Sequence, residues 1–114
     1  MEDIMTDLTT EENDAFALLQ AATRISNARA TENKAALAVA LNENMQLWMC
    51  IQRLTEREDS PLSAGVKANL SKLADFVVSK TLSKGCDVGD ATLDAMENMN
   101  LQIAEGLLEN GKAA

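Results

Sequence analysis

Apolar residues recur at helical spacing along most of the chain. In four separate stretches they fall three, four and seven positions apart, as they do on the buried face of an α-helix. The stretches are centred on the stripes Leu18–Arg29, Leu37–Ile51, Val66–Thr81 and Leu93–Leu107. No segment alternates apolar and polar residues as a half-buried strand does. The pattern therefore predicts four amphipathic helices and no sheet.

Helix-start signals place the first two helices. Thr9 followed by Glu12 matches the T-x-x-E capping box, so the first helix begins after Thr9 and runs to about residue 28. The period falters around Ala30, where Thr31 is a candidate cap for a second helix that reaches about Arg57. The sequence leaves open whether the chain turns at Ala30 or continues as one long helix.

Proline and glycine mark the boundaries of the other two helices. Ser60 is the natural N-cap before Pro61, which is favoured at a first helical position. Gly85 suits the left-handed residue that ends a helix, and a final helix begins near Asp90. We therefore expect an all-α, single-domain bundle of about four helices. It would span residues 9–110, with flexible ends at residues 1–8 and 111–114.

The composition excludes several partners. The chain has 114 residues, of which 46% are hydrophobic and 3% aromatic, and a net charge of −8. Because nucleic acids and anionic membranes attract clustered basic residues, we expect neither as a direct partner. The acidic N-terminus lacks the order of a signal peptide, and no apolar run approaches a membrane span of roughly 20 residues. We expect a cytoplasmic protein.

The residue types also argue against catalysis and metal binding. The chain has no histidine and no tyrosine, and its two cysteines, Cys50 and Cys86, are far apart. Zinc sites usually need four such ligands, and the acids near Asp90 lack the order of a calcium loop. We expect no enzyme activity, no metal and no cofactor.

Two asparagines interrupt otherwise apolar stripes. Asn44 lies between Leu41 and Trp48, and Asn100 lies between Met96 and Ile103. A buried amide is costly unless its hydrogen bonds are satisfied. Each asparagine therefore either bonds within the bundle and fixes how the helices align, or bonds to the backbone of a bound segment.

Trp48 is the centre of a second candidate feature. It lies close to Met45, Leu47, Met49 and Ile51. Trp and Met are enriched at protein–protein interfaces, and Met adapts its shape to different partners. Core packing is the other interpretation and the favoured one for Trp48. Met96 and Met99 on the last helix would extend the same surface.

Several of these positions also form a recognisable series. The segment 44–48, Asn-Met-Gln-Leu-Trp, resembles the N-x-x-L-W segment of the FlaF family of flagellar biosynthesis regulators. The resemblance continues at residues 59–62, where Ser60 replaces the family's usual asparagine, and at residues 70–77. It closes at Asn100–Leu107, which is similar to the family's N-x-x-I-x-x-G-L ending.

The resemblance implies a flagellar protein of α-proteobacteria with flagellin as its partner. It implies either a cytosolic chaperone or adaptor that binds flagellin for secretion, or a post-transcriptional regulator of flagellin synthesis acting with a second regulator, FlbT. For the first of these, a bundle could cover flagellin's amphipathic segments in helix-in-groove fashion. The candidate partner-binding residues are Asn44, Met45, Leu47, Trp48, Met49, Ile51, Asn100, Ile103 and Leu107.

Overall fold

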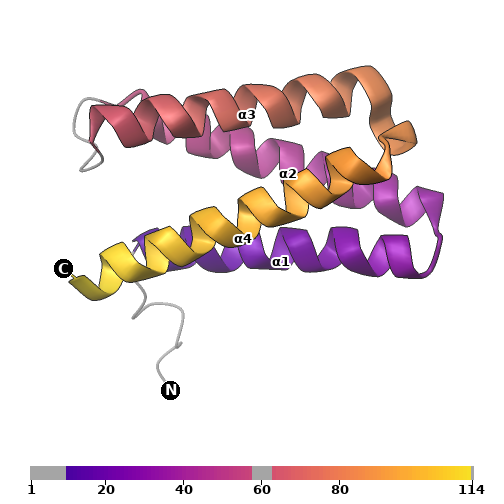
Figure 1. Cartoon of the computed structure of the whole chain (residues 1–114), viewed down its shortest axis with the longest axis horizontal. Helices are drawn as coiled ribbons and strands as arrows, with labels where there is room; N and C mark the ends of the chain where they lie inside the picture. Colours follow the sequence, from indigo (N-terminus) through magenta and orange to yellow (C-terminus); the bar gives the residue numbers. More distant parts are fainter. Residues whose placement is uncertain (1–9, 58–62, 114) are drawn as a thin grey trace.

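The protein is a bundle of four helices. A computed structural model describes residues 10–57 and 63–113. The helices are α1 (Thr10–Ala30), α2 (Lys34–Thr55), α3 (Ala64–Lys84) and α4 (Asp90–Ala113), and the 3₁₀ turn η2 (Gly85–Asp87) joins the last two (Figure 1). The described residues contain no strand. The predicted all-α bundle of four helices is confirmed.

The helices are packed unevenly around the bundle. Helix α1 packs along α4, α2 packs along α3, and α1 and α2 pack against each other. Between α3 and α4 the backbones make almost no contact. Figure 1 shows why: the two helices are joined at one end by η2, and α4 then runs diagonally away from α3 and across α1. The backbones of α3 and α4 are therefore closest near η2 and diverge toward the other end, and we call these two ends of the bundle the closed end and the open end.

The chain turns after Ala30, which settles the question that the sequence left open. Glu32 has a φ of +52°, and Asn33 caps α2 by accepting a hydrogen bond on its side chain from the Ala36 N–H at 3.0 Å. The expected cap, Thr31, is not used. Its hydroxyl donates backward to the Asn27 carbonyl, at 3.1 Å, and so belongs to the end of α1.

The boundaries of α3 and α4 differ in part from the prediction. Helix α3 is capped by Ser63, whose hydroxyl accepts from the Val66 N–H at 3.2 Å, and not by Ser60. Ser60, Pro61, Thr9 and residues 1–8 lie outside the described residues. Gly85 ends α3, as predicted, and has a positive φ of +57°, but its ψ of −134° lies outside the left-handed helical region that the sequence suggested. Helix α4 continues to Ala113, past the expected boundary at residue 110.

The buried side chains form two apolar clusters at opposite ends of the bundle. The turn-end cluster lies near the α1–α2 turn and η2, and the open-end cluster lies where α3 and α4 separate. The turn-end cluster contains Ile25, Ala28, Leu37, Ala40, Leu41, Val88, Leu93 and Met96. The open-end cluster contains Ala15, Leu18, Trp48, Ile51, Leu70, Ala74, Val77 and Ala104.

Candidate functional site

A polar layer separates the two apolar clusters. On α2, Asn44 lies between Leu41 of the turn-end cluster and Trp48 of the open-end cluster. On α4, Asn100 lies between Met96 and Ala104 in the same way. Both asparagine side chains are completely buried. The two interruptions in the apolar stripes therefore meet at one level of the bundle.

The side chains of this layer are hydrogen-bonded to one another. Trp48 Nε1 donates to Asn100 Oδ1 at 2.9 Å. Asn100 Nδ2 donates to the Leu18 carbonyl at 3.1 Å and to Asn44 Oδ1 at 2.8 Å. One amide thus joins α1, α2 and α4. Because a buried amide loses its free energy of hydration, this satisfied arrangement favours a single alignment of the three helices.

Asn44 is only partly satisfied by this layer. Its Oδ1 accepts from Asn100, but its Nδ2 is buried and has no acceptor among the described residues. Rotating the amide by half a turn would place two NH₂ groups against each other, so the orientation is fixed by Asn100. Within the described residues, the polar layer therefore retains one buried donor without a partner, which costs about 1–3 kcal/mol.

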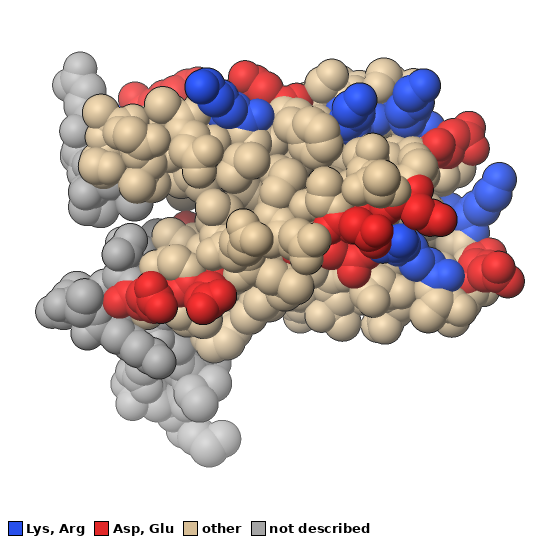
Figure 2. All heavy atoms as spheres, in the orientation of Figure 1, with Lys and Arg blue, Asp and Glu red and all other residues tan. Residues whose placement is uncertain are grey.

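The partner-binding candidates on α4 other than Asn100 lie at the open end. Ile103 and Leu107 are partly buried and pack against the open-end cluster, as Met99 does. From α3, Leu73 and Phe76 pack against the same cluster and are also partly exposed. We call the apolar edge formed by Leu73, Phe76, Met99, Ile103 and Leu107 the α3–α4 opening. Figure 2 shows mostly uncharged surface between α3 and α4 on this side of the molecule.

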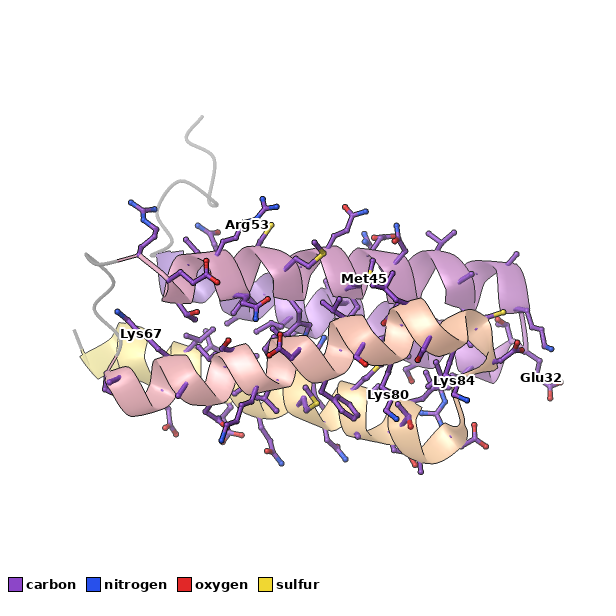
Figure 3. The ribbon with its side chains drawn as sticks, turned by 90° about the horizontal axis from the view of Figure 1, so that it is seen from above. Glu32, Met45, Arg53, Lys67, Lys80 and Lys84 are labelled. Atoms are coloured by element: carbon purple, nitrogen blue, oxygen red, sulfur yellow. The ribbon has the colours of Figure 1, made fainter. Side chains whose placement is uncertain are left out.

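The α2 candidates divide between core and surface. Ile51 is buried in the open-end cluster, and Leu47 packs against it. Met45 also packs there and lies between α2 and α3 (Figure 3), whereas Met49 is 36% exposed. Trp48 is completely buried, as the core interpretation expects. The structure thus gathers most of the α2 candidates beneath the opening and leaves Met49 on the outer surface.

Sequence reasoning misplaced one methionine and missed the contribution of α3. Met96 was expected to extend a surface, but it is completely buried in the turn-end cluster. Leu73 and Phe76 were not among the candidates. The apolar stripe of α3 includes Leu73, but a stripe indicates only that a face is apolar and not which neighbouring helix it meets.

Charged side chains connect α1 to α4 at the closed end of the bundle, which is the end that contains the turn-end cluster. Arg29 near the end of α1 donates to Asp94 at 2.9 Å and also to Glu97, and it lies 3.6 Å from Asp90. The hydrogen bonds that Arg29 donates to Glu97 and, second, to Asp94 raise the pKa of Arg29 above its ordinary value. This cluster ties the last turn of α1 to the first two turns of α4, and so keeps the closed end together.

The described part of the chain has neither a cluster of metal-ligand side chains nor a helix able to span a membrane. Residues 10–57 and 63–113 contain no group of three or more histidine, cysteine or acidic side chains placed to hold a metal ion. None of the helices in these two ranges combines the length and the apolar character that crossing a membrane requires.

Comparison with known proteins gives one finding. No curated protein and no solved structure matches the sequence. The family described as Flagellar protein FlaF matches residues 3–107, which is nearly the whole chain. This range includes the polar layer and the α4 side of the α3–α4 opening. The chain therefore belongs to the FlaF family and is a flagellum-related protein.

Proposed function

We propose that this protein binds flagellin in the cytoplasm as a secretion chaperone or adaptor, and that the α3–α4 opening receives an amphipathic flagellin segment. The family match supports a flagellar role, and the opening supports a binding role. A single observation carries the proposal: large apolar side chains of α3 and α4 remain partly exposed along an edge where the backbones of the two helices are far apart.

The geometry of the opening suits a helical ligand. One wall is the α3 face with Leu73 and Phe76, and the other is the α4 face with Met99, Ile103 and Leu107. The floor is the open-end cluster above the polar layer. A partner helix that adds its own apolar stripe would cover these side chains and gain roughly 25 cal/mol for each Å² removed from water.

Secretion gives a reason for such a device. An amphipathic segment that is free in the cytoplasm exposes an apolar face and tends to aggregate. A carrier that covers this face keeps the segment soluble until export. Because the contact between carrier and segment is non-covalent, the segment can be released without breaking a covalent bond.

The test is the affinity of the purified protein for purified flagellin, measured by calorimetry. Ile103→Asp and Leu107→Asp place a charge on the α4 wall and should each weaken binding by tenfold or more, about 1.4 kcal/mol. Leu82→Asp is the matched control, because Leu82 on α3 is 72% exposed and packs against neither cluster. Circular dichroism establishes that each variant is folded.

Two results would contradict the proposal. One is the absence of flagellin binding by the unaltered protein. The other is an equal loss of binding for all three aspartate variants, which would indicate a non-specific effect of added negative charge.

A further inference from the structure

Gly106 lies in the interior of α4, where glycine is unfavourable. Helix α4 continues for seven residues beyond it, to Ala113. Glycine in a helix interior costs about 1 kcal/mol relative to alanine. The only glycine with a positive φ among the described residues is Gly85, so Gly106 is not required by the backbone conformation.

Packing within the chain does not require a glycine here either. A Cβ atom added to Gly106 would meet nothing within 4 Å, apart from the helix's own backbone. An alanine would therefore fit without any adjustment and would strengthen the helix. The described bundle gives no reason for the absence of a side chain at this position.

The position of Gly106 relates it to the opening. It follows Ile103 by three residues and Met99 by seven, so the three share one face of α4. Ile103 and Met99 border the α3–α4 opening. Gly106 itself is exposed. At this point the wall of the opening is bare helix backbone, which permits another helix to approach closely.

The two walls carry opposite charges. Helix α3 contains four lysines and one aspartate, a net charge of +3. In α4, Asp90, Asp94 and Glu97 belong to the Arg29 cluster at the closed end, whereas the exposed Glu105 and Glu109 lie beside Gly106 at the open end. In Figure 2 basic groups lie along the upper edge, with acidic groups among them, and the groups at the lower left, toward the C-terminal end of α4, are acidic. A helix in the opening would therefore have positive charge on one side and negative charge on the other. This difference favours one orientation of the helix.

We propose that the occupant is an amphipathic flagellin helix that crosses α4 at Gly106 with its backbone in close contact. It carries acidic residues on the flank facing α3 and basic residues on the flank facing α4. This inference rests on the proposed function and specifies the contact within it. Gly106 is then a specificity-determining residue, because any side chain there separates the two helices.

The first experiment compares Gly106→Ala with Gly65→Ala in flagellin binding and thermal unfolding. Gly65 is the matched control: it is exposed in the first turn of α3, and a Cβ there also meets nothing within 4 Å. Both variants should unfold at or above the temperature of the unaltered protein. Gly106→Ala should weaken flagellin binding about tenfold, whereas Gly65→Ala should leave it unchanged.

The second experiment reverses charge on α4 with the double variant Glu105→Lys, Glu109→Lys, since both residues are exposed. We expect a several-fold loss of flagellin affinity at low salt that shrinks at high salt.

The outcomes separate the two proposals. If Gly106→Ala binds as tightly as the unaltered protein while Ile103→Asp does not, the crossing at Gly106 is wrong and the proposed function stands. If the charge reversal has no effect or strengthens binding, the assignment of a basic flank is overturned. If the unaltered protein does not bind flagellin, both proposals fail.

Discussion

The two ends of the bundle use the same four helices in opposite ways. At the turn end, large buried side chains from α1, α2 and α4 pack together, and the partly buried apolar residues against them in the described ranges are Ala36, Phe76 and Cys86. At the open end the cluster is bordered by large, partly buried apolar side chains. These are Leu19, Met45, Leu47, Leu73, Phe76, Met99, Ile103, Leu107 and Leu108.

The closed end is also fastened by connections that the open end lacks. The α1–α2 turn, η2 and the Arg29 cluster all lie there. At the open end, α3 is tied to α2 by Gln52, whose side chain donates to Ser71 at 3.1 Å and to Asp75 at 2.9 Å. Among the described residues, no hydrogen bond or ion pair that we identify links α3 to α4. The difference indicates that the turn end supplies stability and the open end supplies apolar contact surface.

The polar layer between the two ends should be the most sensitive part of the protein. Asn100→Leu keeps the approximate volume but leaves Trp48 Nε1 and the whole Asn44 amide buried without partners. At about 1–3 kcal/mol for each unsatisfied group, we expect a loss of about 4 kcal/mol in the free energy of unfolding. Urea denaturation followed by the fluorescence of Trp48, the only tryptophan, measures it.

Asn44→Leu is the matched comparison within the same layer. It removes the unpartnered Nδ2 and leaves Asn100 bonded to Trp48 and to the Leu18 carbonyl. We therefore expect a loss of no more than about 1 kcal/mol. If the two leucine variants lost equal amounts of unfolding free energy, Asn100 would not be the more important of the two asparagines, contrary to its hydrogen bonds.

A pair of leucines compares the two ends directly. Leu41 is 1% exposed in the turn-end cluster, and Leu41→Ala should cost about 3 kcal/mol of unfolding free energy through lost burial and a cavity. Leu107 is partly exposed at the opening, and Leu107→Ala should cost about 1 kcal/mol. Flagellin affinity should follow the reverse order, falling for Leu107→Ala and staying unchanged for Leu41→Ala. A larger stability loss at Leu107 would remove the distinction between the ends.

Much of this arrangement follows from local sequence signals. The four apolar stripes predicted the four helices, and Gly85 predicted the end of α3, because helical spacing and positive φ are local properties. The interruption of the stripes by Asn44 and Asn100 marked the polar layer. The caps at Asn33 and Ser63 were missed, since neighbouring threonine and serine residues offer equivalent side chains and only the tertiary structure selects among them.

The opening itself could not be predicted from these signals. An amphipathic stripe shows that a helix buries one face, but it does not show how far two helices separate along their length. The separation of α3 from α4 depends on the angle at which α4 crosses α1, which is set by packing between helices distant in sequence. For the same reason the sequence did not show that Met96 is a core residue whereas Met99, on the next turn of the same helix, borders the opening.

The smallest expected effect concerns the charged cluster at the closed end. Arg29→Met keeps most of the apolar stem but leaves Asp94 and Glu97 near each other without their cation. The Arg29 side chain is 25% exposed, so we expect a loss of only about 1 kcal/mol of unfolding free energy at about 0.1 M salt. The loss should be smaller in about 1 M salt, because the Debye length there is about a third of its value at about 0.1 M. Denaturation at the two salt concentrations measures it.

The pH dependence of this loss has a definite sign. Because its acidic partners raise the pKa of Arg29, its contribution is fully present below the ordinary arginine value and disappears only as pH rises through the higher folded-state value. From about pH 6 to about pH 9 the difference between Arg29→Met and the unaltered protein should therefore stay constant. Flagellin affinity should not change, because the cluster lies at the end away from the opening. A loss of affinity in this variant, with the fold intact, would show that the closed end takes part in contact and would remove the division between the two ends.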